Sequence, residues 1–126
     1  MTTLFGNNQF QKLSFSGGTA NGRRIKVAAL ADPGTLIHTG PSDPTMSDEI
    51  WLDAYNSSTA PVALTIEWGA GTSPDDMITV TIPNGQSLTQ VIAGNVLLGN
   101  ATQLTVKAFA ALANVITIGG FVNRMQ

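Results

Sequence analysis

Short segments in which apolar and polar residues alternate recur through this chain, and they constrain its fold more than any other feature of the sequence. The clearest segments cover residues 49–56, 61–69, 77–82, 104–110 and 115–123. Alternation with a period of two residues is typical of a β-strand with one buried and one solvated face. Strands at such close spacing, separated by Gly, Pro and Asn, predict an all-β fold. We expect a single antiparallel β-sandwich of the jelly-roll or immunoglobulin-like type.

Further strands are expected at residues 24–31 and 35–39, with two short ones at residues 87–92 and 96–98 on either side of Ala93-Gly94-Asn95. Residues 56–61 join two of the clearest strands at the length of a hairpin loop. This length predicts that the strands at 49–56 and 62–68 are antiparallel neighbours. The Gly119-Gly120 pair predicts a bulge or a close approach of two backbones in the last strand.

The chain is expected to form one domain over residues 22–126, preceded by an N-terminal arm over residues 1–21. The arm mixes Asn, Gln, Gly and Thr, yet it carries Phe5, Phe10 and Phe15, at spacings that fit neither a helix face nor a strand face. Disordered tails are typically poor in aromatic residues. These side chains are therefore expected to insert into a partner, or to cover an edge of the chain's own sheet.

Charge is scarce and unevenly distributed. Charged residues make up 11% of the chain, and Cys is absent, which excludes disulfides and thiolate metal sites. Residues 1–31 carry four basic side chains and no acid, a charge of +4, and the remaining two bases and eight acids give −6, for the net charge of −2. A basic leading segment on an acidic body indicates an interaction site, or else a solvated strand flank. The net charge does not favour nucleic acid as a partner.

No membrane or export signal is expected. The longest uncharged stretch, residues 77–106, is interrupted by Gly, Pro, Asn and Gln. The first residues lack the basic and then apolar regions of a signal peptide. We therefore expect the protein in the cytoplasm where it is made, or in a particle assembled there.

The residues that catalysis would use do not form a known pattern. A Ser-His-Asp device would have to use His38, the one histidine, which we expect to be an exposed or hydrogen-bonded strand residue. Asp48-Glu49 is expected to be a polar turn rather than part of a calcium site. Asp53 and Glu67 could face each other across the expected hairpin as glycosidase carboxylates do, but the sequence around them offers no supporting polar residues. The sequence therefore predicts no enzyme, no metal and no cofactor.

Aromatic side chains on nominally solvated strand faces are the best candidates for binding. Trp51 and Tyr55 share the polar face of one strand, and Phe109 lies on the polar face of another. Such residues anchor protein interfaces or stack on sugars, or they are covered by a second layer of the fold. The expected interface residues are Phe5, Phe10, Phe15, Lys12, Arg23, Arg24, Lys26, Trp51, Tyr55 and Phe109.

Four strings of the sequence resemble a known protein family. They are DEIWLDAYNSS at 48–58, LTIEWG at 64–69, PDDMITVTIP at 74–83 and VITIGGFVNRM at 115–125, and PGTLIHTG at 33–40 also fits. Together they resemble the head decoration, or cement, proteins of tailed bacteriophages over roughly residues 30–125, while the arm contributes nothing. The resemblance implies a β-sandwich that oligomerises, often as a homotrimer, on the outer surface of the capsid in the virion. There it would bridge neighbouring copies of the major capsid protein, its implied partner.

The function expected from the sequence is therefore that of a structural virion protein that clamps capsid subunits. The alternative is a carbohydrate-binding or receptor-binding module of a phage tail fibre or baseplate, and a small hydrolase is a further rival.

Overall fold

Two antiparallel sheets contain most of the chain. The computed structural model describes residues 9–11, 14–15, 18–19, 23–85 and 87–126, the first three ranges as backbone only. One sheet, here called the β6 sheet, contains β1 (Gln9–Gln11), β4 (Ile25–Lys26), β11 (Ile116–Met125), β6 (Ser47–Asn56) and β9 (Thr89–Leu98). The other, the β7 sheet, contains β5 (Thr35–Thr39), β10 (Thr105–Ala110), β7 (Val62–Gly69) and β8 (Met77–Ile82).

A small third sheet pairs β2 (Ser14–Phe15) with β3 (Gly18–Thr19). No helix occurs in the described ranges, and hence none that is long and apolar enough to cross a membrane.

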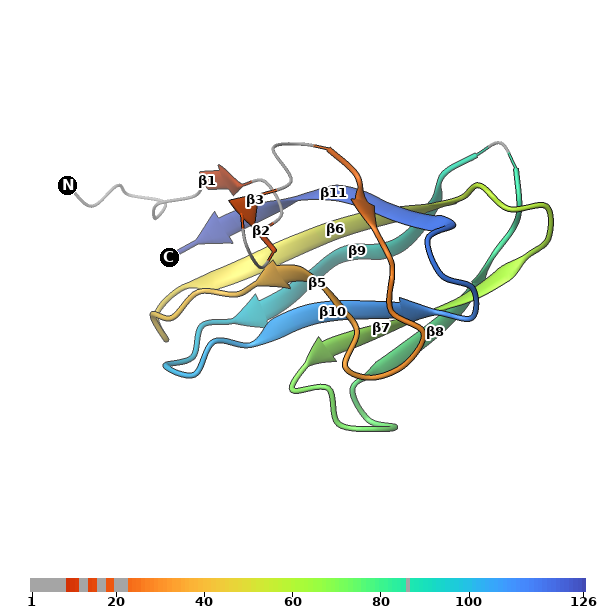
Figure 1. The fold of residues 1–126 in the computed structure, drawn as a ribbon. Coiled ribbons are helices and arrows are strands. Elements are labelled where there is room, and N and C mark those ends of the chain that lie inside the picture. The colour runs from red at the N-terminus through yellow and green to blue at the C-terminus, as the bar shows by residue number, and fades with distance from the viewer. Residues whose placement is uncertain (1–8, 12–13, 16–17, 20–22, 86) are drawn as a thin grey trace.

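The β6 and β7 sheets face each other and enclose the core (Figure 1). Alternation decides which side chains enter it. On β6, Ile50, Leu52 and Ala54 point inward and are at most 1% exposed, and on β7 the same holds for Leu64 and Ile66. Burial of each large aliphatic side chain stabilises a fold by about 1.5–3 kcal/mol. The predicted antiparallel β-sandwich is confirmed.

Consecutive strands mostly lie in opposite sheets. From β4 onward the chain crosses between the sheets at every connection except the β7–β8 hairpin. The prediction that the strands at 49–56 and 62–68 are antiparallel neighbours is therefore wrong: β6 pairs with β11 and β9, whereas β7 pairs with β10 and β8. The segment of hairpin length between them is an arch from one sheet to the other.

The buried Asn56 side chain explains why this short connection crosses the sandwich. Its amide nitrogen donates to the carbonyl oxygens of Ala60 (2.9 Å) and of Ile82 (3.0 Å), the last residue of β8. Its carbonyl oxygen accepts hydrogen bonds from the backbone amide (2.9 Å) and the hydroxyl (2.7 Å) of Ser58. One side chain thus ties the end of β6 to the arch and to the opposite sheet.

Several predicted boundaries change for local reasons. The strands at 35–39 and 77–82 are confirmed, but the strand expected at 24–31 is shortened to β4. The two strands expected at 87–92 and 96–98 are one strand, β9, because Gly94 forms a bulge. Asn95 pairs with Ile50 of β6 and Ala93 pairs with the next residue, Trp51, so Gly94 has no partner in the ladder. Gly94 adopts a φ of +77°, which suits glycine.

The predicted close backbone approach at Gly119-Gly120 is confirmed. Gly120 has a φ of +145°, and a Cβ atom there would lie 1.9 Å from the carbonyl oxygen of Trp51 on β6. A Cβ on Gly119 would lie 2.5 Å from Nη1 of Arg24. Glycine is thus required at position 120, whereas a Cβ on Gly119 would meet only the movable end of the Arg24 side chain.

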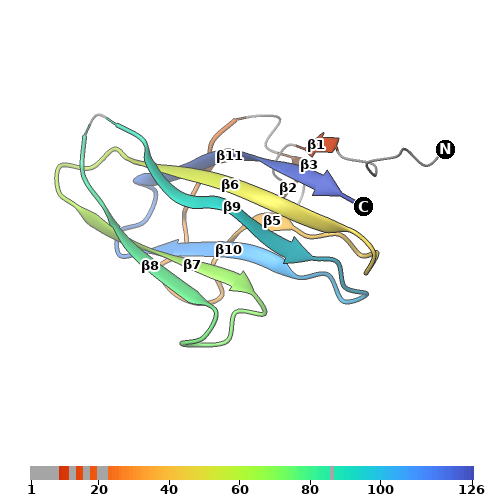
Figure 2. The same ribbon diagram turned by 180° about the vertical axis from the view of Figure 1, so that it is seen from behind.

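Short strands occupy one edge of the β6 sheet, and a long one forms the other. β1 pairs with Val122–Arg124 and β4 pairs with Thr117–Ile118, so both lie along the same side of β11. β9 forms the opposite edge, and β8 forms an edge of the β7 sheet; the two strands diverge from the loop that joins them (Figure 2).

Candidate functional site

The outer face of the β6 sheet gathers large apolar side chains. We call Trp51, Tyr55, Val96, Leu98 and Phe121 the aromatic face. Pairing places Phe121 opposite Trp51, Val96 opposite Glu49 and Leu98 opposite Ser47. Trp51 and Tyr55 are half-buried, whereas Phe121, Val96 and Leu98 are 43%, 47% and 64% exposed. A cluster of this kind is typical of protein interaction sites.

Trp51 is held on both sides. Its rings stack on Phe121, with centroids 6.0 Å apart and planes 10° from parallel. On its other flank the six-membered ring lies against Gly94, where a Cβ atom would be 2.9 Å from Cζ2. Its indole nitrogen donates to Oε1 of Glu49 at 3.0 Å. A sugar platform needs a free indole surface, so this arrangement favours a protein partner, for which Phe121 and the β9 side chains provide the exposed area.

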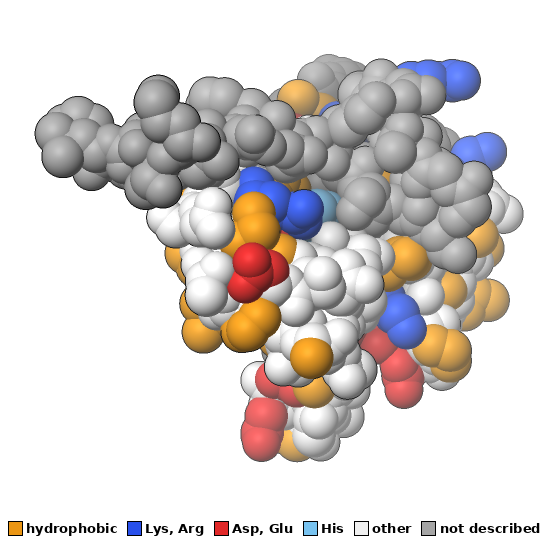
Figure 3. Space-filling model, turned by 90° about the vertical axis from the view of Figure 1, so that its left-hand side faces the viewer, with side chains coloured by type: hydrophobic (Ala, Val, Ile, Leu, Met, Phe, Trp, Pro, Cys, Tyr) orange, Lys and Arg blue, Asp and Glu red, His pale blue; other side chains and the backbone are white. Residues whose placement is uncertain are grey.

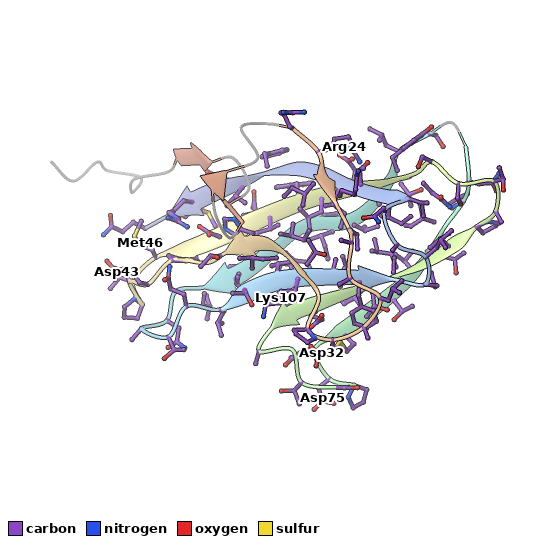
Figure 4. The ribbon with its side chains drawn as sticks, viewed as in Figure 1. Arg24, Asp32, Asp43, Met46, Asp75 and Lys107 are labelled. Atoms are coloured by element: carbon purple, nitrogen blue, oxygen red, sulfur yellow. The ribbon has the colours of Figure 1, made fainter. Side chains whose placement is uncertain are left out.

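The charges next to these aromatic residues are engaged with one another. Nη1 of Arg24 pairs with Oδ1 of Asp53 at 2.7 Å. The same guanidinium donates from Nε to the hydroxyl of Thr117 (2.9 Å) and from Nη2 to its carbonyl oxygen (2.9 Å), so that it lies across β11 (Figure 4). Because these charges already have partners, covering the face costs less desolvation than it would on an ordinary charged surface.

The structure brings together only part of the expected interface. Arg24, Trp51 and Tyr55 share the outer face of the β6 sheet, and exposed Arg23 and Lys26 flank it. Phe109 is half-buried on the outer face of the β7 sheet, beside Thr65 and on the other side of the sandwich. Phe5, Lys12 and the side chains of Phe10 and Phe15 lie outside the described residues.

Sequence reasoning did not include Phe121, Val96 or Leu98 in the site. Periodicity puts Phe121 and Val122 on opposite sides of the last strand, but it does not say which side is buried, and no sequence signal showed that Phe121 faces Trp51. Val96 and Leu98 follow the Gly94 bulge, which obscured their register with β6.

A buried ionic cluster joins the two sheets at the end of the sandwich shown in Figure 3, where the one histidine side chain lies beside basic side chains. Nε2 of His38 on β5 is 2.7 Å from Oδ2 of Asp48 on β6. Arg124 on β11 donates to both oxygens of the same carboxylate, at 2.8 and 2.9 Å. Asp48-Glu49 is therefore not a turn: Asp48 points into the core from β6, and Glu49 points outward.

The cluster keeps Asp48 ionised. Burial would raise the pKa of Asp48, but the hydrogen bonds and charges of Arg124 and His38 outweigh it, so that this pKa lies below its ordinary value. The bond to Asp48 likewise raises the pKa of Arg124. His38 and Asp48 are 1% and 0% exposed, which leaves no room for a substrate beside them. The cluster is therefore best explained as a structural link between sheets.

A polar pocket of about 140 Å³ lies on the other outer face, lined by Asp32, Glu67, Gly71, Thr105 and Lys107 (Figure 4). Oε1 of Glu67 accepts a hydrogen bond from the amide of Gly34 at 2.7 Å, and this side chain is 3% exposed. Burial raises the pKa of Glu67, as do its hydrogen bond with the Asp32 carboxyl and the charge of that group; Gly34 and Lys107 act in the opposite direction.

Glu67 cannot act together with Asp53, as the expected hairpin would have allowed. The two residues lie on opposite outer faces of the sandwich, because β6 and β7 belong to different sheets. Within the described part of the chain, no group of three or more His, Asp or Glu side chains is placed to hold a metal ion.

The fold and the site thus define a β-sandwich that presents an apolar, aromatic sheet face. Comparisons with protein-family models, with curated proteins and with solved structures find no match to this chain.

Proposed function

We propose that this chain is a structural protein of a tailed-phage particle that binds the outer surface of the head and clamps neighbouring major capsid subunits. The proposal rests on the sequence resemblance to head decoration proteins, and the aromatic face is the observation that supports it best.

Two of the strings that carry the resemblance contain two of the three strands that carry the face. DEIWLDAYNSS contains most of β6, and VITIGGFVNRM contains β11. These strands pair along their whole length, from Asn56 opposite Ile116 to Ser47 opposite Met125, and their outer side chains include the Trp51–Phe121 stack. Two of the strings therefore supply Trp51, Tyr55 and Phe121 of the aromatic face, whereas the other three lie in the β7 sheet.

The proposed mechanism is passive. Each copy covers a joint between shell subunits with the aromatic face, and attachment of many copies converts weak single contacts into stable clamping. Exposed Phe121 is the expected anchor, since truncation of a central aromatic residue typically weakens an interface by about 1–4 kcal/mol. Residues 1–21 are proposed as a second contact, through Phe5, Phe10 and Phe15.

Binding to purified heads tests the proposal. The heads come from the phage that encodes this chain, after deletion of its gene, and added protein is followed by co-sedimentation. We expect wild type to bind, and Phe121→Ala to bind at least about tenfold more weakly. Phe109→Ala is the matched control: it removes an aromatic ring from the opposite outer face and should bind as wild type does.

Each result decides one part of the proposal. Wild type that does not bind heads contradicts the capsid function, and specific binding on a glycan array supports the tail-fibre alternative instead. Binding that is lost in Phe109→Ala but kept in Phe121→Ala assigns the contact to the β7 sheet. Deletion of residues 1–21 without any loss of binding removes the arm from the proposed interface.

A further inference from the structure

At the free edge of the β6 sheet, the last four residues of β9 lack the usual protection against strand pairing. β9 is ten residues long, TQVIAGNVLL, and contains no charged residue and no proline. Natural edge strands commonly carry Lys or Pro, or are short, because their unpaired backbone groups otherwise bind another strand. The bulges at Val91 and Gly94 disturb the first part of β9, but residues 95–98 pair regularly with β6.

Two residues at this edge direct their backbone groups away from β6. The amide of Gly99 bonds to the carbonyl oxygen of Met46, so the odd-numbered residues of this segment face β6. In an antiparallel strand both backbone groups of a residue point to one side, and successive residues alternate. The amide and carbonyl groups of Val96 and Leu98 therefore point outward from the sheet edge.

The side chains of the same two residues are also uncovered, at 47% and 64% exposure, whereas Leu97 between them is 2% exposed. Apolar side chains and unpaired backbone groups thus occur together at Val96 and Leu98. The segment matches a copy of itself: in an antiparallel arrangement centred on Leu97, Val96 of one copy lies opposite Leu98 of the other. Each such pair exchanges both of its backbone hydrogen bonds.

We propose that two copies of this chain pair antiparallel through residues 95–98 of β9, about a two-fold axis at Leu97, to form one continuous sheet. The absence of charge favours a second copy as the partner. A two-fold axis places a segment beside its own copy, so any charge on this short segment would lie close to the same charge across the axis. Residues 77–106, which include the neighbouring edge strand β8, contain no charged residue at all.

The pairing would place both aromatic faces on the same side of the joined sheet. It goes beyond the proposed function and holds whether or not the chain binds a capsid. It also predicts a closed dimer, whereas the resemblance to decoration proteins implies trimers, so the mass in solution distinguishes the two.

Analytical ultracentrifugation over a range of concentrations tests the pairing. We expect wild type to form dimers, and Val96→Lys to raise the dimer dissociation constant at least about tenfold, because it places a charge opposite apolar Leu98 of the other copy and brings two like charges together diagonally across the axis. Leu112→Lys is the matched control. Leu112 is 50% exposed in the connection between β10 and β11, away from β9, and its replacement should leave the dissociation constant unchanged. Circular dichroism verifies that both variants fold.

Amide hydrogen exchange provides a second readout. The amides of Val96 and Leu98 should be protected in concentrated samples and exchange rapidly in dilute ones, whereas the amide of Leu97 is protected in both. A wild type that remains monomeric overturns the proposal, and so does an oligomer that Val96→Lys leaves intact. Monomers whose Val96 and Leu98 amides become protected only on a capsid also overturn it, since a strand of the shell would then occupy this edge.

Discussion

Neutralising Asp48 should destabilise this protein far more than neutralising Asp53, although both are acids of β6 that pair with an arginine. Asp48→Asn keeps the size of the side chain and removes its charge. Asp53→Asn makes the same change five residues along the strand. Asp48 is 0% exposed and bonds to Arg124 and His38, whereas the side chains of Asp53 and Arg24 are 29% and 34% exposed.

The expected magnitudes follow from burial. Removing one partner of a buried ion pair typically costs about 3–5 kcal/mol, because the other charge is left without compensation. The Arg124 side chain is 25% exposed and regains some hydration, so we expect about 3 kcal/mol for Asp48→Asn. Exposed pairs contribute about 0–1 kcal/mol, which is the range expected for Asp53→Asn.

Urea unfolding at neutral pH measures both values, and its pH dependence tests their cause. The pKa of Asp48 is lowered in the folded state. The contribution of Asp48 to the free energy of unfolding is therefore complete above the ordinary aspartate pKa and is lost as pH falls through the lowered value. The difference between wild type and Asp48→Asn should therefore shrink in acid. Two results would refute this account of the buried cluster. One is a loss of unfolding free energy in Asp48→Asn that lies within about 1 kcal/mol of the loss in Asp53→Asn. The other is a loss in Asp48→Asn that does not change with pH.

Three further results are expected from unfolding measurements. The pKa of Glu67 is raised in the folded state, so its contribution to the free energy of unfolding is complete below the ordinary glutamate pKa and is lost as pH rises through the raised value. Wild type should therefore lose stability relative to Glu67→Gln between acid and neutral pH. A stability difference that stays constant with pH would contradict this. Gly120→Ala should cost at least about 2 kcal/mol more than Gly85→Ala. Both glycines have positive φ, but a Cβ atom meets nothing within 4 Å at Gly85, so equal losses would mean that the backbone near Trp51 can move apart. Asn56→Ala should cost about 2 kcal/mol, because it removes the amide that bonds to the buried carbonyl oxygen of Ile82. A change below about 1 kcal/mol would show that water replaces the amide.

Strand positions could be predicted from the sequence because alternation is a local property. Burial on β6 and β7 follows the expected periodicity closely. The pairing of strands could not be predicted, since it depends on whether a short connection turns back or crosses the sandwich. At Asn56 that choice depends on a hydrogen bond to Ile82, a residue 26 positions away.

The candidate site was predictable only in part for the same reason. Periodicity placed Trp51, Tyr55 and Phe109 on outer faces, but it does not say to which sheet a strand belongs. The burial of Glu67 was also unpredictable from its own strand, where it occupies an outward position. It is covered by the loop that contains Gly34, whose amide bonds to its carboxylate.

The position of β11 in the sheet has a consequence during synthesis. This strand, which follows all others in the chain, lies between β6 and the two N-terminal strands β4 and β1. A ribosome adds about 5–20 residues per second, so β6 is complete roughly 3–14 s before Met125 is added. During that interval the nascent chain exposes the apolar residues that β11 later covers. The domain must therefore finish folding after β11 has emerged, and chaperones have several seconds to bind it first.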